Sequence, residues 1–161
     1  MTDEQLSAAV GDKLRARRWR LAVAESCTGG LLGHLITEVA GSSDYFVGGV
    51  IVYSNEAKEE LLAVPRKTLE HHGAVSEPAA RQMALGVRRL LGADVSLSVT
   101  GIAGPGGGSA DKPVGLVYVA LDADDGQECR RLVWDGDRHE NKARSARAAL
   151  GMLWEYLAPR A

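Results

Sequence analysis

The order in which strand-like and helix-like segments alternate most constrains the fold of this chain. Short apolar runs typical of strands occupy 20–25, 45–54 and 94–101, and two more, 114–122 and 129–135, flank the turn 123–127. Segments with helical spacing or capping signals occupy 2–18, 28–41, 55–64, 67–73, 76–91 and 137–158. Alternation followed by a run of strands predicts an α/β fold, a three-layer α/β/α sandwich on a mixed, mainly parallel five-stranded sheet.

Length, charge and cysteine content restrict the class of protein. The 161 residues predict one domain, 1–161. A net charge of −2 and an aromatic content of 5% argue against a nucleic-acid partner. The charged N-terminal segment is neither a signal peptide nor a membrane span, so no membrane partner is expected. Two cysteines outside any CxxC pair fit the cytoplasm, and the histidines lack metal-site spacing.

The stretch AESCTGG, 24–30, marks the first candidate site, at a strand-to-helix junction. Ligands of open α/β sheets bind at the carboxyl ends of strands, where the N–H groups of the next helix can hold a phosphate or an oxyanion. Ser26 is a candidate nucleophile, and the amides near Cys27 and Thr28 are candidate oxyanion donors. Alternatively, Ser26 or Thr28 only caps the helix. Cys27 is either a rival nucleophile or a small buried residue.

Two further junctions carry candidate residues. In YSNEAK, 53–58, Lys58 falls in the first helical turn, where the helix dipole and burial would both lower its pKa towards that of a useful base. Tyr53 ends the strand beside it. The stretch 100–115 carries six glycines, whose amides can cradle an anion, and it matches neither GxGxxG nor a Walker A motif.

The start of the last helix adds Arg138 and Lys142, four residues apart on one face. Either they recognise phosphate or carboxylate, or they belong to an ordinary charged helix start. The residues alone therefore indicate a hydrolase or a binder of a small anionic ligand, with a candidate serine–lysine pair.

Five motifs together are similar to the CinA C-terminal domain family of nicotinamide mononucleotide deamidases: AESCTGG, GSSDYFVGGVIVYSNEAK, GAVSEPAA, TGIAGPGGGSADKPVGLVYVAL and GDR. The resemblance spans about 24–144. It implies hydrolysis of the nucleotide carboxamide to nicotinic acid mononucleotide and ammonia, a step of pyridine-nucleotide salvage, without metal or cofactor. It also implies the α/β/α layers and a homodimer. Some members carry an additional N-terminal domain, and this chain is expected to be the stand-alone form.

The same resemblance assigns roles. Ser26 is the nucleophile and Lys58 its partner, Tyr53 and Thr100 are further catalytic residues at the same site, and Arg138 binds substrate. Cys27 and Thr28 shape the turn, and Gly29 and Gly30 allow close approach. The substrate phosphate lies on Arg138 or on the glycine loop, represented by Gly104, Gly106 and Gly107. Two alternatives remain open: a metal-dependent phosphohydrolase, and a catalytically silent nucleotide-binding protein linked to competence or DNA damage.

Overall fold

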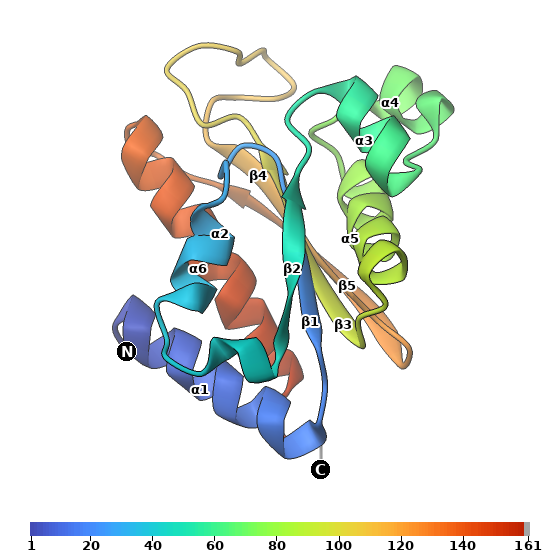
Figure 1. The fold of residues 1–161 in the computed structure, drawn as a ribbon. Coiled ribbons are helices and arrows are strands. Elements are labelled where there is room, and N and C mark those ends of the chain that lie inside the picture. Colours follow the sequence, from blue (N-terminus) through green and yellow to red (C-terminus); the bar gives the residue numbers. More distant parts are fainter. Residues whose placement is uncertain (160–161) are drawn as a thin grey trace.

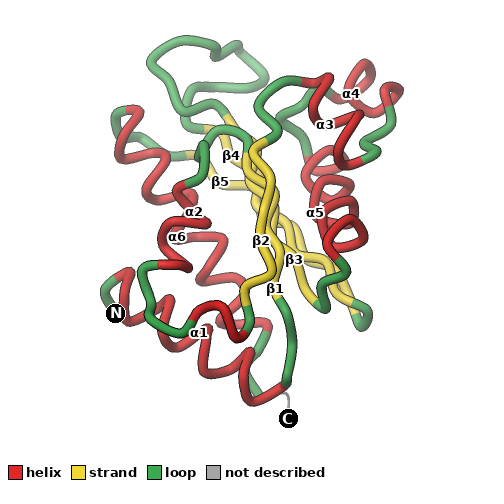
Figure 2. The backbone as a smooth tube through the Cα atoms, in the orientation of Figure 1, coloured by secondary structure: helices red, strands yellow, loops and turns green. Residues whose placement is uncertain are grey.

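The helices and strands follow the predicted order in the computed structural model, which describes residues 1–159 (Figures 1 and 2). The helices are α1 (Asp3–Arg17), α2 (Leu31–Thr37), α3 (Asn55–Leu62), α4 (Arg66–His72), α5 (Glu77–Leu91) and α6 (Arg138–Tyr156). The strands are β1 (Leu21–Glu25), β2 (Phe46–Ile51), β3 (Val95–Gly101), β4 (Leu116–Ala123) and β5 (Gly126–Val133), and a 3₁₀ turn, η1, spans Ser42–Asp44. Residues 160 and 161 of the predicted domain lie outside the described residues.

The five strands form one mixed sheet in the order β2-β1-β3-β4-β5. Strand β1 pairs in parallel with β2 and β3, while β4 is antiparallel to both of its neighbours. The predicted mixed sheet is confirmed, and its parallel part comprises β1, β2 and β3. The carboxyl ends of these three strands therefore share one edge of the sheet.

Helices cover both faces of the sheet, which confirms the three layers. Helices α1, α2 and α6 lie on one face, and α3, α4 and α5 lie on the other (Figure 1). Leu14, Leu97 and Leu150 belong to the apolar core of the first face, and Met83 and Val87 on α5 belong to that of the second. Burial on both faces explains why β1 and β3 read as continuous buried runs.

Several element boundaries differ from the prediction. Strand β2, expected over 45–54, ends at Ile51, so Tyr53 follows the strand instead of ending it. The helix expected over 28–41 spans only Leu31–Thr37 and ends before the predicted stop at Gly41. It starts later because residues 27–30 form a turn in which Gly29 and Gly30 have φ of +60° and +107°. A side chain would be strained there, so helical spacing alone overextends the helix. Strand β5 begins at Gly126 rather than at 129, because Asp124 and Asp125 alone form the hairpin turn.

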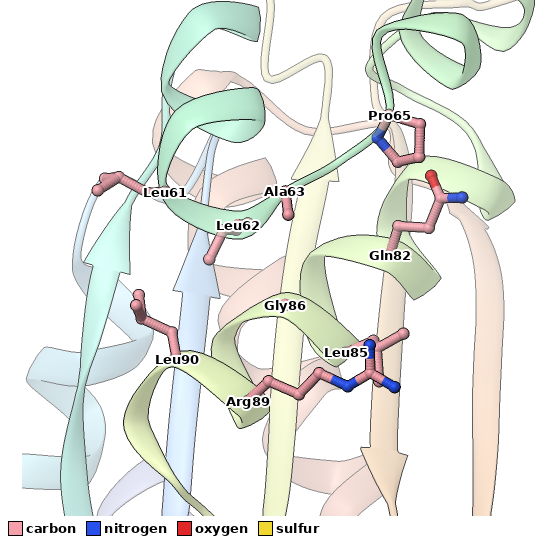
Figure 3. A pocket seen from close by; sticks show the side chains of 9 residues that line it. All are labelled: Leu61, Leu62, Ala63, Pro65, Gln82, Leu85, Gly86, Arg89 and Leu90. Atoms are coloured by element: carbon pink, nitrogen blue, oxygen red, sulfur yellow. The ribbon is translucent and has the colours of Figure 1, made fainter.

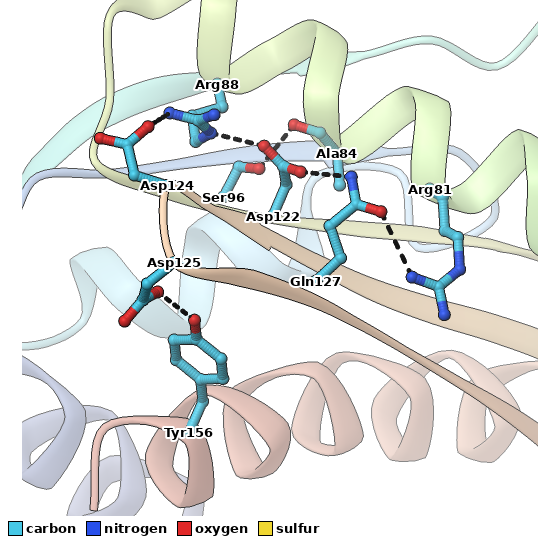
Figure 4. A network of polar contacts seen from close by, with 9 residues as sticks. All are labelled: Arg81, Ala84, Arg88, Ser96, Asp122, Asp124, Asp125, Gln127 and Tyr156. Atoms are coloured by element: carbon cyan, nitrogen blue, oxygen red, sulfur yellow. Dashed lines mark hydrogen bonds and ion pairs between the residues drawn. The ribbon is translucent and has the colours of Figure 1, made fainter.

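A buried polar network occupies the sheet end opposite the carboxyl ends of the parallel strands (Figure 4). Asp122 is 2% exposed and accepts from Arg88 and from Gln127. Arg88 also pairs with the exposed Asp124 at 2.9 Å. The network joins α5 to the β4–β5 hairpin, far from the predicted site residues.

Candidate active site

A pocket of about 260 Å³ opens at the edge where β1, β2 and β3 end. Most of the residues predicted for a site line it: Ser26, Cys27, Tyr53, Lys58, Thr100, Gly104, Gly106, Gly107 and Arg138. The turn after β1, the start of α3, the end of β3, the glycine-rich loop and the start of α6 each contribute. The fold thus brings together segments that are far apart in the sequence.

Lys58 and Ser26 form a buried pair in this pocket. Ser54 caps α3 by accepting from the amide of Ala57, and this fixes the helical turn that carries Lys58. The Lys58 side chain is 1% exposed, and its Nζ lies 3.0 Å from Oγ of Ser26. Nucleophile and base must approach within hydrogen-bonding distance, and these two side chains do.

The surroundings of Lys58 favour a neutral amine. Burial lowers its pKa, and only a weak opposing influence of Cys27 raises it. No carboxylate among residues 1–159 forms an ion pair with it. Nζ donates to the carbonyls of Val52 at 2.8 Å and Tyr53 at 3.2 Å. A neutral amine has two N–H groups, so these carbonyls leave its lone pair for Ser26.

Cys27 is poorly suited to act as a thiolate. Its side chain is 6% exposed, and burial raises its pKa to about 11, with a smaller contribution from the charge of Glu25. The thiolate is the nucleophilic form of cysteine, and a pKa this high leaves little of it near neutral pH. The chemistry of the two neighbours therefore favours Ser26.

Glu25 organises the turn that carries Ser26, a role that sequence reasoning missed. Its buried carboxylate accepts from the Thr28 hydroxyl at 2.6 Å and from three amides: Gly30 at 3.2 Å, Leu32 at 2.8 Å and Gly33 at 3.0 Å. These amides begin α2, whose N-cap, Gly30, has no side chain to cap it. A carboxylate ending an otherwise apolar strand was the signal available in the sequence.

This arrangement corrects the expectation that the N–H groups of α2 are free for a ligand. Glu25 occupies the amides of Gly30, Leu32 and Gly33. Thr28 is 1% exposed, and its hydroxyl donates to the same carboxylate. Thr28, Gly29 and Gly30 are not among the residues that line the pocket. The amides of Cys27 and Thr28 donate to no other residue within 1–159 and stay candidate oxyanion donors.

Arg138 connects two walls of the pocket. One guanidinium nitrogen donates to the carbonyl of Gly104 at 2.8 Å, and the other donates to the Tyr53 hydroxyl at 3.2 Å. Asn141 holds the same loop by donating to the carbonyl of Ala103 at 3.0 Å. Through Arg138 and Asn141, the start of α6 therefore fixes the glycine-rich loop beside the serine–lysine pair.

Thr100, at the end of β3, is buried in the same pocket. Its hydroxyl donates to the carbonyl of Ala74 at 2.9 Å.

We also examined the rest of the described chain for metal sites, membrane-spanning helices and other cavities. Within residues 1–159 no three His, Cys, Asp or Glu side chains are grouped so that they could hold a metal ion. None of the helices described is both long enough and apolar enough to span a bilayer. A larger apolar groove of about 430 Å³ lies where α3 packs on α5, between Leu61 and Leu90, and contains none of the predicted site residues (Figure 3).

Comparison with known proteins identifies relatives of this arrangement. Residues 3–157 match the CinA C-terminal domain. A CinA-like protein of Chlorobaculum tepidum is 53% identical over 154 residues, which cover 92% of this chain and 36% of that protein. The matched relatives from Moorella thermoacetica and Syntrophobacter fumaroxidans are likewise covered to only 37% of their length. The chain thus spans little more than a third of these curated relatives.

Solved structures match over nearly the whole chain. A competence-damaged protein (CinA) superfamily protein from Klebsiella pneumoniae is 37% identical, with a TM-score of 0.94 over 98% of this chain and 99% of that one. A competence/damage inducible protein from Agrobacterium tumefaciens is 41% identical, with a TM-score of 0.93 over 98% and 96%. This chain therefore has the fold of these CinA superfamily structures.

Proposed function

Because this chain belongs to the CinA C-terminal domain family, we propose that it hydrolyses the carboxamide of nicotinamide mononucleotide, giving nicotinic acid mononucleotide and ammonia. One observation carries the proposal: a buried lysine with no counter-ion among residues 1–159 lies 3.0 Å from a serine hydroxyl in the pocket. Amide hydrolysis requires a nucleophile, a base that removes its proton and an acid that protonates the leaving nitrogen.

In the first half-reaction Lys58 takes the proton of the Ser26 hydroxyl as Oγ attacks the carboxamide carbon. The amides near Cys27 and Thr28 are the candidate donors to the resulting oxyanion. Lys58 then gives its proton to the amide nitrogen, the C–N bond breaks, and ammonia leaves behind an ester on Ser26. Water, deprotonated by Lys58, hydrolyses that ester and frees the carboxylic acid and the serine.

The other lining residues surround the reacting pair, and the catalytic contribution expected of Tyr53 and Thr100 belongs to this proposal as well. Tyr53, Arg138 and the glycine-rich loop enclose the substrate, and Thr100 supports the wall formed by Ala74. No step uses a metal or a cofactor. A homodimer in the cytoplasm belongs to the same proposal, and the family resemblance supports it.

Ammonia release from nicotinamide mononucleotide tests the proposal directly. The purified wild type should release ammonia equally with and without EDTA. Ser26→Ala should lose at least about a thousandfold in kcat, which corresponds to ~4 kcal/mol of transition-state stabilisation. Activity that EDTA abolishes and magnesium restores would favour the metal-dependent phosphohydrolase, and binding without turnover would favour the silent binding protein.

A further inference from the structure

A second cavity adjoins the catalytic pocket and shares Arg138 with it. It measures about 380 Å³ and is lined by Leu31, Arg138, His139 and Lys142. The catalytic pocket, at about 260 Å³, is smaller than the ~300–1,000 Å³ typical of sites that enclose a whole small ligand. A mononucleotide whose carboxamide reaches Ser26 therefore needs additional space, and the adjoining cavity offers it beyond Arg138.

The two cations of this second cavity have no carboxylate partner in the described part of the chain. Lys142 is half-buried, yet it forms neither an ion pair nor a side-chain hydrogen bond with any of residues 1–159. Among the described residues, Arg138 donates only to uncharged oxygens, those of Gly104 and Tyr53.

The nearby carboxylates serve another cation on the same helix. Arg144 pairs with Asp135 at 2.8 Å and with Glu140 at 3.5 Å. Asp137 accepts from the amide of Glu140 as the cap of α6. The acids around this helix start thus leave Arg138 and Lys142 without ion pairs in the part of the chain that the structure describes. Two such cations beside one cavity are suited to a dianion.

Lys142 also lies close to the turn that carries the nucleophile. A β-carbon built on Gly29 would stand 3.9 Å from its Nζ. Its charge reaches the Cys27 thiol, whose pKa it lowers slightly against the larger effect of burial. The side chain therefore extends from α6 towards the turn after β1, on the side where the second cavity lies.

We infer that the second cavity is a phosphate subsite, in which Lys142 and Arg138 together bind the 5′-phosphate of a mononucleotide substrate. This inference rests on the proposed function and selects between the two phosphate positions that the sequence left open: the phosphate lies by the start of α6, not on the glycine loop. The subsite makes the enzyme selective for the nucleotide over the corresponding riboside.

Steady-state kinetics of Lys142→Met, with Arg144→Gln as the matched control, test the subsite. Each variant removes one positive charge from the same helix. Losing a hydrogen bond to a charged group should raise the KM of Lys142→Met for nicotinamide mononucleotide about tenfold or more, with kcat nearly unchanged. Arg144→Gln should keep the wild-type KM. Wild type should prefer the nucleotide over nicotinamide riboside at least about tenfold, and Lys142→Met should lose most of that preference.

Binding of ribose 5-phosphate, measured by calorimetry, separates this inference from the proposed function. The wild type should bind it and Lys142→Met should bind it about tenfold more weakly, whether or not the protein releases ammonia. A wild type without amidase activity but with this binding difference would refute the function alone. Equal KM values and equal ribose 5-phosphate affinities for the wild type and Lys142→Met would overturn the subsite and leave the function standing.

Discussion

Replacing Glu25 with glutamine tests whether one buried carboxylate holds the nucleophile turn in place. The substitution keeps the size of the side chain and exchanges one acceptor oxygen for an NH₂ donor. In the structure one carboxylate oxygen accepts from Thr28, Gly30 and Leu32, and the other accepts from the amide of Gly33 at 3.0 Å. A glutamine oxygen can serve the first group, but its NH₂ would then face the Gly33 amide, donor against donor.

The expected loss follows from these four contacts. A hydrogen bond to a charged group contributes roughly 1.5–3 kcal/mol, and a neutral one about 0.5–1.5 kcal/mol. Losing the Gly33 bond and weakening the other three would amount to several kcal/mol if nothing relaxed. Since the turn can adjust and Gly30 is only partly buried, we expect a loss of about 3 kcal/mol in the free energy of unfolding. For a domain of this size that lowers Tm by roughly 6–12 °C.

Urea unfolding and ammonia release should be measured on the same preparations. Glu38→Gln is the matched control, because Glu38 lies at the other end of α2 and its side chain is 60% exposed. The control should stay within about 0.5 kcal/mol of the wild type. Glu25→Gln should also lose at least about tenfold in kcat, because Ser26 adjoins the loosened turn. A stability loss no larger than that of the control would refute the capping argument.

The remaining predictions concern three other side chains, those of Cys27, Lys58 and Arg88. Cys27→Ser should keep most of the activity, and alkylation that inactivates the wild type but spares this variant would reassign the nucleophile. The rate should rise with pH along a limb centred below the ordinary lysine pKa, because burial lowers the pKa of Lys58, and Lys58→Arg should be inactive. In the window between the folded and unfolded pKa values of Lys58 the unfolded chain binds more protons, so stability should rise with pH there, and Lys58→Met should abolish that increment. Arg88→Met should lower the free energy of unfolding by about 3 kcal/mol, because it leaves Asp122 buried without its cation; the exposed neighbour Arg89→Met is the control, and an equal effect of both would contradict this.

The sequence predicted the element order and brought Ser26, Lys58, Thr100 and Arg138 to one edge of the sheet. These predictions were possible because the local residue pattern indicates where a strand ends and a helix begins, and because the carboxyl ends of parallel strands lie at the same edge of a sheet. The residue-specific roles came from the family resemblance, and they stay predictions until the variants are measured.

Tertiary contacts explain what the sequence did not predict. The sequence showed Glu25 as a carboxylate at the end of an apolar strand, but it did not show that this carboxylate accepts from the amides of Leu32 and Gly33. Lys142 has no ion pair among the described residues because the nearby carboxylates, Asp135 and Glu140, pair with Arg144. Which carboxylate pairs with which cation is determined only when the helix packs against the rest of the domain.

The wide sequence separation of the pocket residues has a consequence for folding kinetics. Strand β1, which leads to Ser26, needs β3 as a parallel neighbour, and Leu21 meets Val95 only after a long loop has closed. Non-local parallel pairing of this kind is formed slowly, because the entropy of loop closure is lost before contacts compensate for it. The wall that Arg138 provides comes later still in the chain. The complete pocket therefore assembles only after β3 has paired with β1 and α6 has been synthesised and has docked.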